Sequence, residues 1–184
     1  MIALSRSQRK SFSRYVIIAA ISLGLVACNK PTVKSGLVGQ QFPSVDLVDL
    51  GSQTHPFSQY RGKLVVLNVW ATWCSPCRRE LPSLQRLSDA LDPGQFVVIG
   101  LSVDDDDHVV REYLKDKNIH FAAFIDKEMK IAGDVLKVDS FPMTFVIDPK
   151  GKLVKVIVGE RDWSAKAVID ALHALYQGLP DELF

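Results

Sequence analysis

The segment N-V-W-A-T-W-C-S-P-C-R-R-E-L-P, residues 68–82, decides the fold because it connects a predicted buried strand to a predicted helix. The run that leads into it, residues 63–70, is apolar almost throughout, which is typical of a strand covered on both faces in a mostly parallel sheet. Beyond it, leucines recur at helical spacing, at positions 81, 84, 87 and 91, up to the helix-ending Asp-Pro-Gly at 92–94. Cys74 is therefore expected at a strand-to-helix junction.

The remaining chain alternates between predicted strands and helices. Residues 42–57 suggest a β-hairpin with a loose turn around Gly51. After the first helix we expect a strand, a helix and a strand, at 96–103, about 107–118 and 121–126. A second β-hairpin is expected within 144–158, and a last amphipathic helix at about 164–177. This alternation is typical of an α/β sheet.

The length and charge of the chain are those of an ordinary single-domain globular protein. At 184 residues the chain has room for one domain. Hydrophobic residues make up 47% and charged residues 23%, as in ordinary globular proteins, and the formal net charge is +1. Because the chain has no basic excess, nothing indicates a nucleic acid as a partner.

The first 27 residues have the composition of an export signal. They contain four basic residues and no acid, which leaves 18 basic against 21 acidic residues downstream. The last thirteen of them, residues 15–27, are uncharged, and a basic start before a short apolar run is typical of a signal peptide. As a helix these residues would span about 20 Å, less than the roughly 30 Å of a hydrocarbon core, which disfavours a permanent membrane span.

The sequence Leu-Val-Ala-Cys at 25–28 resembles the lipobox of bacterial lipoproteins, in which the signal is cut before the cysteine and the thiol is acylated. This resemblance implies a signal peptide at 1–27, a lipidated Cys28 with a flexible tether at 28–37, and a folded domain at 38–184. The alternative is an ordinary cleaved signal peptide, or an uncleaved membrane anchor, in which Cys28 has no special role. Lipidation would account for the odd third cysteine of an exported protein.

The spacing of Cys74 and Cys77 favours a reactive dithiol. Unpaired N–H groups and the helix dipole stabilise an anion at a helix start, which lowers a thiol pKa from about 8.5 to about 7. Cys74 would then attack a disulfide, and Cys77, one turn further along, would resolve the mixed disulfide. Three alternatives remain: a local structural disulfide, half of a zinc site, and copper delivery with a histidine as third ligand.

The segment W-A-T-W-C-S-P-C-R-R-E-L-P resembles the active-site segment of the TlpA/ResA-type thioredoxin-like proteins, which are exported, membrane-anchored thiol:disulfide oxidoreductases. The similarity extends to Gly62-Lys63 and to F-P-M-T-F-V-I-D at 141–148, and it covers roughly residues 38–177. It implies a thioredoxin-like fold, with a central mixed β-sheet flanked by helices and an added N-terminal β-hairpin. It also implies a redox-active Cys74–Cys77 disulfide, with no other cofactor and no metal.

The resemblance assigns roles to two further residues. Pro142 matches the cis-proline that faces the dithiol in this family and leaves the preceding backbone free to pair with a substrate strand. Glu80, three residues after Cys77, matches the helix glutamate, whose carboxylate can exchange a proton with the Cys77 sulfur. Ordinary thioredoxins carry a buried aspartate where this chain has Asn68, and an amide cannot accept that proton. We therefore expect Glu80 to assist Cys77, with a solvated helix glutamate as the alternative.

Four residues are expected to shape the substrate groove: Trp73, Ser75, Pro76 and Phe141. Trp73 is expected beside Cys74, whereas Trp70 is expected in the core. At 141–143 the family more often shows smaller or hydroxylated residues than Phe-Pro-Met, which predicts a more apolar groove here.

The acidic run Asp104–Asp107 lies in a predicted loop before the second helix, where carboxylates are favoured by the helix N-terminus. We interpret these acids as residues that cap the helix and keep the protein surface soluble. A metal site is the alternative.

These features predict an enzyme that reduces disulfides in other exported proteins, in the periplasm or on the outer side of the cytoplasmic membrane. The Ser75-Pro76 dipeptide lacks a histidine to stabilise the thiolate, which favours reduction over oxidation. The resemblance implies apocytochrome c or copper-site proteins as clients and a membrane thiol reductase as electron donor. A copper-carrying metallochaperone is the non-enzymatic alternative. A peroxiredoxin-type peroxidase would need a proline and a threonine where this chain has Leu67 and Ala71.

Overall fold

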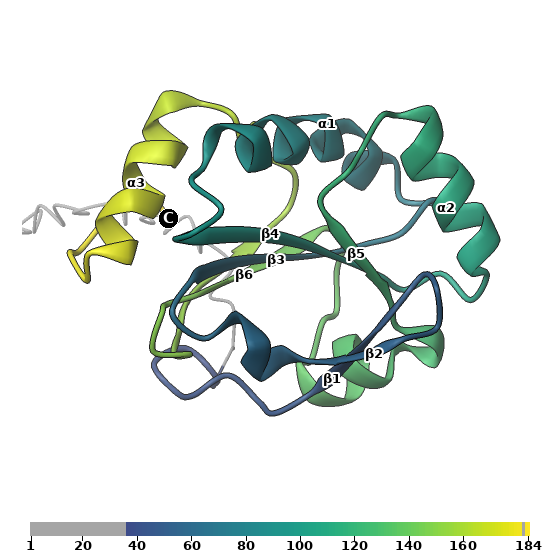
Figure 1. Ribbon diagram of the computed structural model, residues 1–184, viewed down its shortest axis with the longest axis horizontal. Helices are drawn as coiled ribbons and strands as arrows, with labels where there is room; N and C mark the ends of the chain where they lie inside the picture. The colour runs from purple at the N-terminus through teal and green to yellow at the C-terminus, as the bar shows by residue number, and fades with distance from the viewer. Residues whose placement is uncertain (1–35, 182) are drawn as a thin grey trace, which may run out of the picture. The chain divides into compact units, whose positions relative to one another are not determined.

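The structure is a computed structural model and describes residues 36–181 and 183–184. Its strands are β1 Asp46–Asp49, β2 Thr54–Pro56, β3 Leu64–Trp70, β4 Phe96–Ser102, β5 Ala122–Ile125, β6 Met143–Ile147 and β7 Leu153–Val158. They form one mixed sheet in the order β2-β1-β5-β4-β3-β6-β7 (Figure 1). The pairs β3–β4 and β4–β5 are parallel, and the other neighbouring strands are antiparallel.

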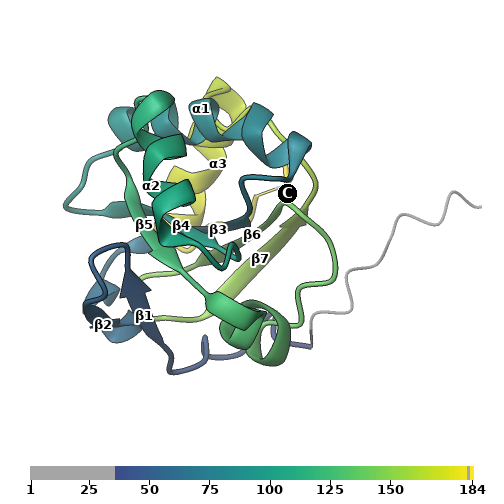
Figure 2. The same ribbon diagram turned by 90° about the vertical axis from the view of Figure 1, so that its right-hand side faces the viewer.

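Helices cover both faces of this sheet. They are α1 Ser75–Ala90, α2 Asp107–Asp116 and α3 Lys166–Tyr176, with three short helices, η1 Phe57–Tyr60, η2 Lys127–Met129 and η3 Lys130–Val135. Figures 1 and 2 show α1, α2 and α3 on one side of the sheet, and η2 with η3 on the opposite side. The central mixed sheet with flanking helices and an N-terminal hairpin, β1–β2, agrees with the predicted architecture.

The strand β3 lies in the interior of the sheet, and all seven of its residues are buried. It pairs with the parallel β4 along its whole length and with the antiparallel β6 from Val65 to Val69. Because both faces are covered, its residues are apolar except for Asn68, which pairs with Thr144 of β6. A strand held on both sides therefore leads directly into the cysteine segment.

One segment was not predicted from the sequence. Residues 127–135, which lie between β5 and β6, form η2 and η3. Glu128 and Met129 have positive φ angles, of 62° and 54°, which a regular helix or strand does not contain. The segment therefore leaves no periodic hydrophobic pattern for sequence analysis to detect.

Residues 39–42 lie along the first part of β7, an edge strand of the sheet. The Gly39 amide donates to the Leu153 carbonyl at 2.8 Å, and the Leu153 amide donates to the Gln40 carbonyl at 2.9 Å. A third bond, of 2.8 Å, joins the Phe42 amide to the Gly151 carbonyl. The segment that enters the domain therefore covers part of this edge.

The predicted signal peptide at 1–27, the lipidation site Cys28 and most of the tether at 28–37 lie outside the described residues. Within residues 36–181 and 183–184, no helix combines the length and the hydrophobicity that a membrane span requires.

Gly100 of β4 leaves room for two large side chains. A Cβ at this position would lie 2.8 Å from Cε2 of Phe121 and 3.1 Å from Nε1 of Trp70. We expect Gly100→Ala to lower the free energy of unfolding by about 1–3 kcal/mol, because the packed core must shift to accept the methyl group. Gly133→Ala is the control, since its Cβ would meet no atom closer than 3.4 Å. Denaturant titration measures both, and equal stability of the two variants would contradict the packing argument.

Candidate active site

Cys74 and Cys77 lie at the start of α1, four and seven residues beyond the end of β3. Cys74 is the N-cap residue of the helix, and its Sγ accepts a hydrogen bond of 3.2 Å from the Cys77 amide. The two sulfurs form a disulfide. Cys74 is 6% exposed and Cys77 is fully buried. The predicted strand-to-helix junction is therefore confirmed, and Cys74 is the cysteine nearer to solvent.

Two predicted groove residues from distant parts of the chain meet beside the first cysteine. Trp73 is 63% exposed, and its ring contacts that of Phe141 edge to face, with 5.5 Å between the ring centroids. The Phe141–Pro142 peptide bond is cis, as the family resemblance implies. Ser75, which is exposed, and Pro76, which is half-buried, form the first turn of α1. Trp73, Ser75 and Pro76 thus flank Cys74 in the sequence, and Phe141 contacts this segment through the Trp73 ring.

Glu80 is buried, with only 2% of its surface exposed. Its Oε1 accepts a hydrogen bond of 2.7 Å from Nδ2 of Asn68. Its Oε2 accepts from Nε1 of Trp163 at 3.0 Å and from the Arg161 amide at 3.1 Å. Burial raises the pKa of Glu80 from 4.5 to about 7, although these hydrogen bonds oppose the shift. The alternative of a solvated helix glutamate is therefore wrong, because the carboxyl is buried and titrates near neutral pH.

Asn68 connects Glu80 to the sheet. Its amide nitrogen also donates to Oγ1 of Thr144 at 2.9 Å, while its Oδ1 is buried and has no hydrogen-bond partner within the described part of the chain. Three partners in this cluster, Thr144, Trp163 and the Arg161 amide, were not predicted as site residues. They come from segments more than sixty residues away from Glu80. Thr144 lies in the family motif at 141–148, which did not indicate this contact, and no motif marks Arg161 or Trp163.

A cleft of about 290 Å³ lies beside Glu80. The residues that line it with Glu80 are Arg79, Ser83, Arg86, Glu160, Arg161 and Asp162. Two ion pairs connect α1 to the loop after β7: Arg79 with Glu160 at 2.5 Å, and Arg86 with Asp162 at 3.7 Å. The cleft is open to solvent, and neither cysteine lines it.

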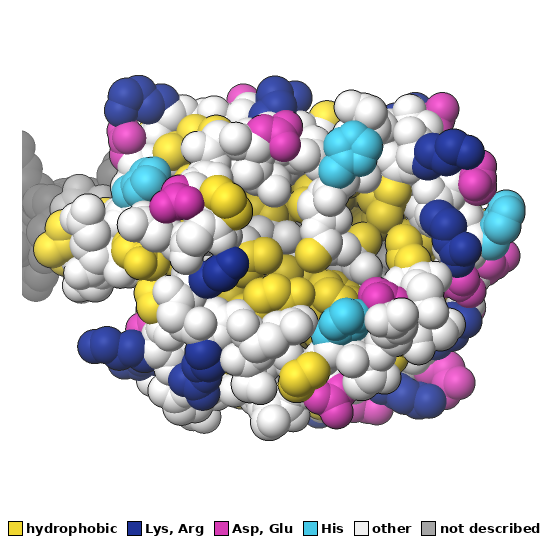
Figure 3. Space-filling view, in the orientation of Figure 1, with side chains coloured by type: hydrophobic (Ala, Val, Ile, Leu, Met, Phe, Trp, Pro, Cys, Tyr) yellow, Lys and Arg dark blue, Asp and Glu magenta, His cyan; other side chains and the backbone are white. Residues whose placement is uncertain are grey.

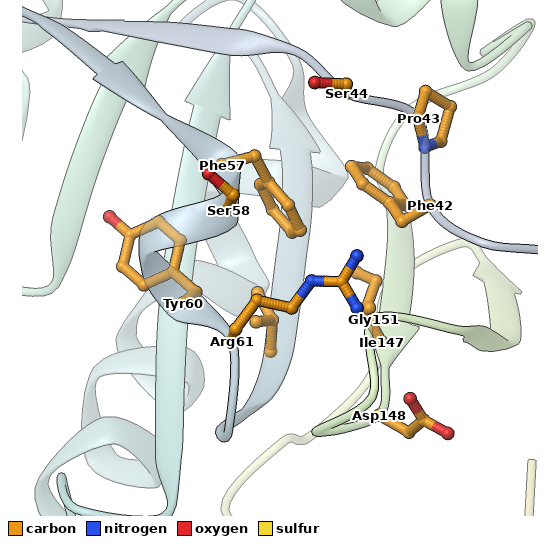
Figure 4. Close-up of a pocket in the computed structure, with 11 residues that line it drawn as sticks. Phe42, Pro43, Ser44, Phe57, Ser58, Tyr60, Arg61, Ile147, Asp148 and Gly151 are labelled. Atoms are coloured by element: carbon orange, nitrogen blue, oxygen red, sulfur yellow. The ribbon is translucent and has the colours of Figure 1, made fainter.

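A second pocket lies near the opposite end of β3 (Figure 4). Phe42 and Phe57 face each other there, with ring centroids 4.4 Å apart. Arg61 donates to the Lys150 carbonyl and lies over Gly151, where any Cβ would collide with its guanidinium. The pocket contains none of the predicted site residues. The predicted site residues therefore lie away from this pocket.

The acidic run Asp104–Asp107 lies at the start of α2. No group of three or more His, Cys, Asp or Glu side chains is placed to hold a metal ion among residues 36–181 and 183–184. Asp106 caps α2, since its Oδ1 accepts from the His108 amide at 2.8 Å. Asp107 pairs with Arg111 and, at 3.5 Å, with Lys127. The capping interpretation is confirmed for Asp106, whereas Asp104 is buried.

Charges of both signs are mixed on the molecular surface. On the face shown in Figure 3, Lys and Arg side chains lie close to Asp and Glu side chains and form no large patch of one sign. Apolar side chains on this face lie mostly in hollows between polar groups. This distribution agrees with the balanced composition of the chain.

Comparisons with known proteins identify the family. The sequence profile of the AhpC/TSA family matches residues 38–156, a range that includes both cysteines and most of the described domain. The thiol-disulfide oxidoreductase ResA of Bacillus cereus is 33% identical over 124 residues, which are 67% of this chain and 71% of that protein.

Solved structures share the fold. A thiol:disulfide interchange protein of the thioredoxin family from Chlorobium tepidum TLS is 28% identical, with a TM-score of 0.61 over 72% of this chain and 95% of that one. A secreted thiol-disulfide isomerase from Corynebacterium glutamicum is 25% identical, with a TM-score of 0.66 over 74% and 86% of the two chains.

The predicted thioredoxin-like fold is therefore confirmed, and so is the reaction type. Enzymes of this kind transfer electrons through a redox-active dithiol, which is the Cys74–Cys77 pair here. The chain belongs to the AhpC/TSA family, and within it the protein is a thioredoxin-like thiol:disulfide oxidoreductase of the TlpA/ResA type.

Proposed function

We propose that this oxidoreductase reduces disulfides in exported proteins, with Cys74 as the attacking thiol and Cys77 as the resolving thiol. The observation that carries the proposal is the position of the Cys74 sulfur at the N-terminus of α1, where the Cys77 amide points at it from 3.2 Å. An N–H donor and the helix dipole favour the thiolate over the thiol. A sulfur held in this way is a nucleophile at neutral pH.

Each turnover moves two electrons. The Cys74 thiolate attacks one sulfur of the client disulfide and bonds to it, and the client S–S bond breaks to leave a client thiolate that takes up a proton. Cys77 then attacks the Cys74 sulfur, which releases the second client thiolate and closes the Cys74–Cys77 disulfide. The client is thereby reduced and the dithiol is oxidised. Cys74 suits the first step because it is the more exposed of the two.

Cys77 must lose a proton before it attacks, and we assign Glu80 as the acceptor. Glu80 lies about one turn beyond Cys77 on α1, and burial raises its pKa to about 7. A general base is most effective when its pKa lies near the working pH. The cleft beside Glu80 would then let the proton reach bulk water.

The client segment is proposed to lie against Trp73, Phe141 and the cis-proline Pro142, with Ser75 and Pro76 beside the attacked disulfide. Support comes from the exposed Trp73 ring and its edge-to-face contact with Phe141. Aromatic rings offer a large apolar contact area with few rotatable bonds. We therefore expect client segments with apolar side chains next to the target cysteine.

The leader supports an exported protein that is attached to a membrane. Residues 1–27 have the pattern of a signal peptide, and we propose that Cys28 carries the lipid, with 28–37 as tether to the domain at 38–184. The relative from Corynebacterium glutamicum is described as secreted. We further propose apocytochrome c or copper-site proteins as clients and a membrane thiol reductase as electron donor. The Ser75-Pro76 dipeptide, which lacks a histidine, supports the reducing direction.

Replacement of Cys77 is expected to trap the client. In the full-length Cys77→Ala variant the resolving thiol is missing, so the client remains bound to Cys74 as a mixed disulfide. Non-reducing electrophoresis of the exported fraction, followed by mass spectrometry, identifies the partner. Cys74→Ala is the matched control and should form no such adduct. Adducts formed by Cys77 in Cys74→Ala would show that Cys77, and not Cys74, attacks the client first. Tight Cu(I) binding without insulin reduction would instead favour a copper carrier.

The role of Glu80 is tested through the pH dependence of exchange. The wild-type rate should rise as pH increases through about 7, because the ionised carboxylate becomes available to accept the Cys77 proton. Glu80→Gln cannot accept a proton, so its exchange rate should fall by about 100-fold above pH 7 and keep only the rise that follows ionisation of the Cys74 thiol. Stopped-flow reduction of a disulfide substrate from pH 6 to 9 measures both rates. Glu112→Gln, at an exposed position of α2, is the control. Unchanged rates in Glu80→Gln would refute the role.

The raised pKa of Glu80 also predicts how stability depends on pH. The folded state binds the Glu80 proton more tightly than the unfolded state, so this stabilisation is complete below pH 4.5 and is lost as pH rises through about 7. The loss should reach about 3 kcal/mol relative to Glu80→Gln, which cannot titrate. Urea titrations of both oxidised proteins at pH 4.5 and pH 8 measure it. A constant difference between the two proteins would show that Glu80 has an ordinary pKa.

A further inference from the structure

Asp104 is a buried carboxylate that the proposed reaction does not yet use. It lies two residues beyond the end of β4 and is 7% exposed. Its Oδ1 accepts from the Thr72 hydroxyl at 2.7 Å, and its Oδ2 accepts from the Thr72 amide at 2.9 Å and from the Ser102 hydroxyl at 2.6 Å. One side chain thus satisfies three donors on two segments.

The other acids of this run have surface roles. Asp105 accepts from the Glu128 amide at 3.3 Å, Asp106 caps α2, and Asp107 pairs with basic side chains. No ion pair among the described residues includes Asp104, which is held by neutral donors alone. A buried carboxylate lowers the free energy of unfolding unless its oxygens accept hydrogen bonds, as those of Asp104 do.

The segment that Asp104 holds is the one that carries the reactive groups. Thr72 is followed by the exposed Trp73 and then by Cys74, whose amide donates to the Ala71 carbonyl at 3.2 Å. The connection between β3 and α1 is only four residues long, so a shift of Thr72 must move its neighbours. Both the groove ring and the attacking sulfur therefore depend on where Thr72 is fixed.

We propose that Asp104 is a positioning residue for thiol–disulfide exchange, which acts through Thr72 to hold the Trp73 ring and the Cys74 sulfur in place for the incoming disulfide. The inference rests on the proposed role of Cys74 as the attacking thiol. Exchange requires the attacking sulfur to approach along the S–S axis, and a displacement of about 1 Å can lower a rate by about 100-fold.

The test compares Asp104→Ala with Asp104→Asn in the full-length protein. Alanine removes every acceptor, and kcat/KM for insulin reduction should fall at least about tenfold. Asparagine has nearly the same shape: its oxygen can accept from the Thr72 amide, and its nitrogen can donate to the Thr72 hydroxyl. Asp104→Asn should therefore keep kcat/KM within about threefold of wild type. Asp106→Ala, in the same loop, is the matched control and should leave kcat/KM unchanged, although it removes the cap of α2.

A second readout reports on the loop itself. Trp70 and Trp163 are fully buried, so mobility of an exposed tryptophan reports on Trp73. Time-resolved fluorescence anisotropy should show faster motion of Trp73 in Asp104→Ala but not in Asp106→Ala. If Asp104→Ala does not fold, Thr72→Val and Thr72→Ser provide the comparison, because only serine keeps the hydroxyl donor. Thr72→Ser should then exceed Thr72→Val in kcat/KM, and equal values would overturn the inference.

The outcomes separate this inference from the proposed function. If wild-type protein reduces insulin and Asp104→Ala does so equally well, the positioning role is wrong. If Asp104→Asn is as impaired as Asp104→Ala, charge rather than hydrogen-bond geometry is responsible, and the inference is also wrong. If wild-type protein does not reduce insulin, or Cys77→Ala forms no adduct on Cys74, the proposed function fails instead.

Discussion

The proposed reaction depends on one interaction, the hydrogen bond from the Cys77 amide to the Cys74 sulfur. It exists because a fully buried strand, β3, ends four residues before a helix whose first N–H groups have no partners within the helix. The strands β4 and β6 pair with β3 on its two sides, so the position of the helix N-terminus is fixed. The proposed reactivity of Cys74 therefore follows from the packing of the whole sheet, and not from the two cysteines alone.

The surroundings of Glu80 show how the fold moves an acid away from its ordinary pKa. Burial raises the pKa of the Glu80 carboxyl. Hydrogen bonds from Asn68, Arg161 and Trp163 lower it, but by less than burial raises it. The carboxyl is thus left with a pKa of about 7, where small changes in its surroundings alter its charge. A neutral amide at position 68, in place of a second acid, leaves Glu80 as the buried acid about one turn from Cys77, the proposed resolving cysteine.

Local patterns predicted the central parts of the fold and the site. The apolar run of β3, the leucine spacing of α1 and the two cysteines are each visible within about twenty residues of sequence, because periodicity and helix-end chemistry act locally. The cis bond before Pro142 and the role of Glu80 came from family resemblance. Asp104 was interpreted only as part of a capping and solubilising run, and Trp163 was assigned no role, because their importance arises from contacts with Thr72 and Glu80, which lie 32 and 83 residues away. Irregular backbone at Glu128 and Met129 likewise leaves no repeat to detect.

Residues 39–42 cover the first part of the edge strand β7 and so reduce the backbone that is free to pair with another molecule. An uncovered edge strand presents free N–H and C=O groups that pair readily with a second molecule. Here the groups of Gly151 and Leu153 are already occupied, and Leu153 is fully buried. A shortened chain that began after residue 42 would uncover them together with an apolar side chain. Residues 39–42 therefore satisfy backbone groups at this edge that a shortened chain would leave free for pairing with a second molecule.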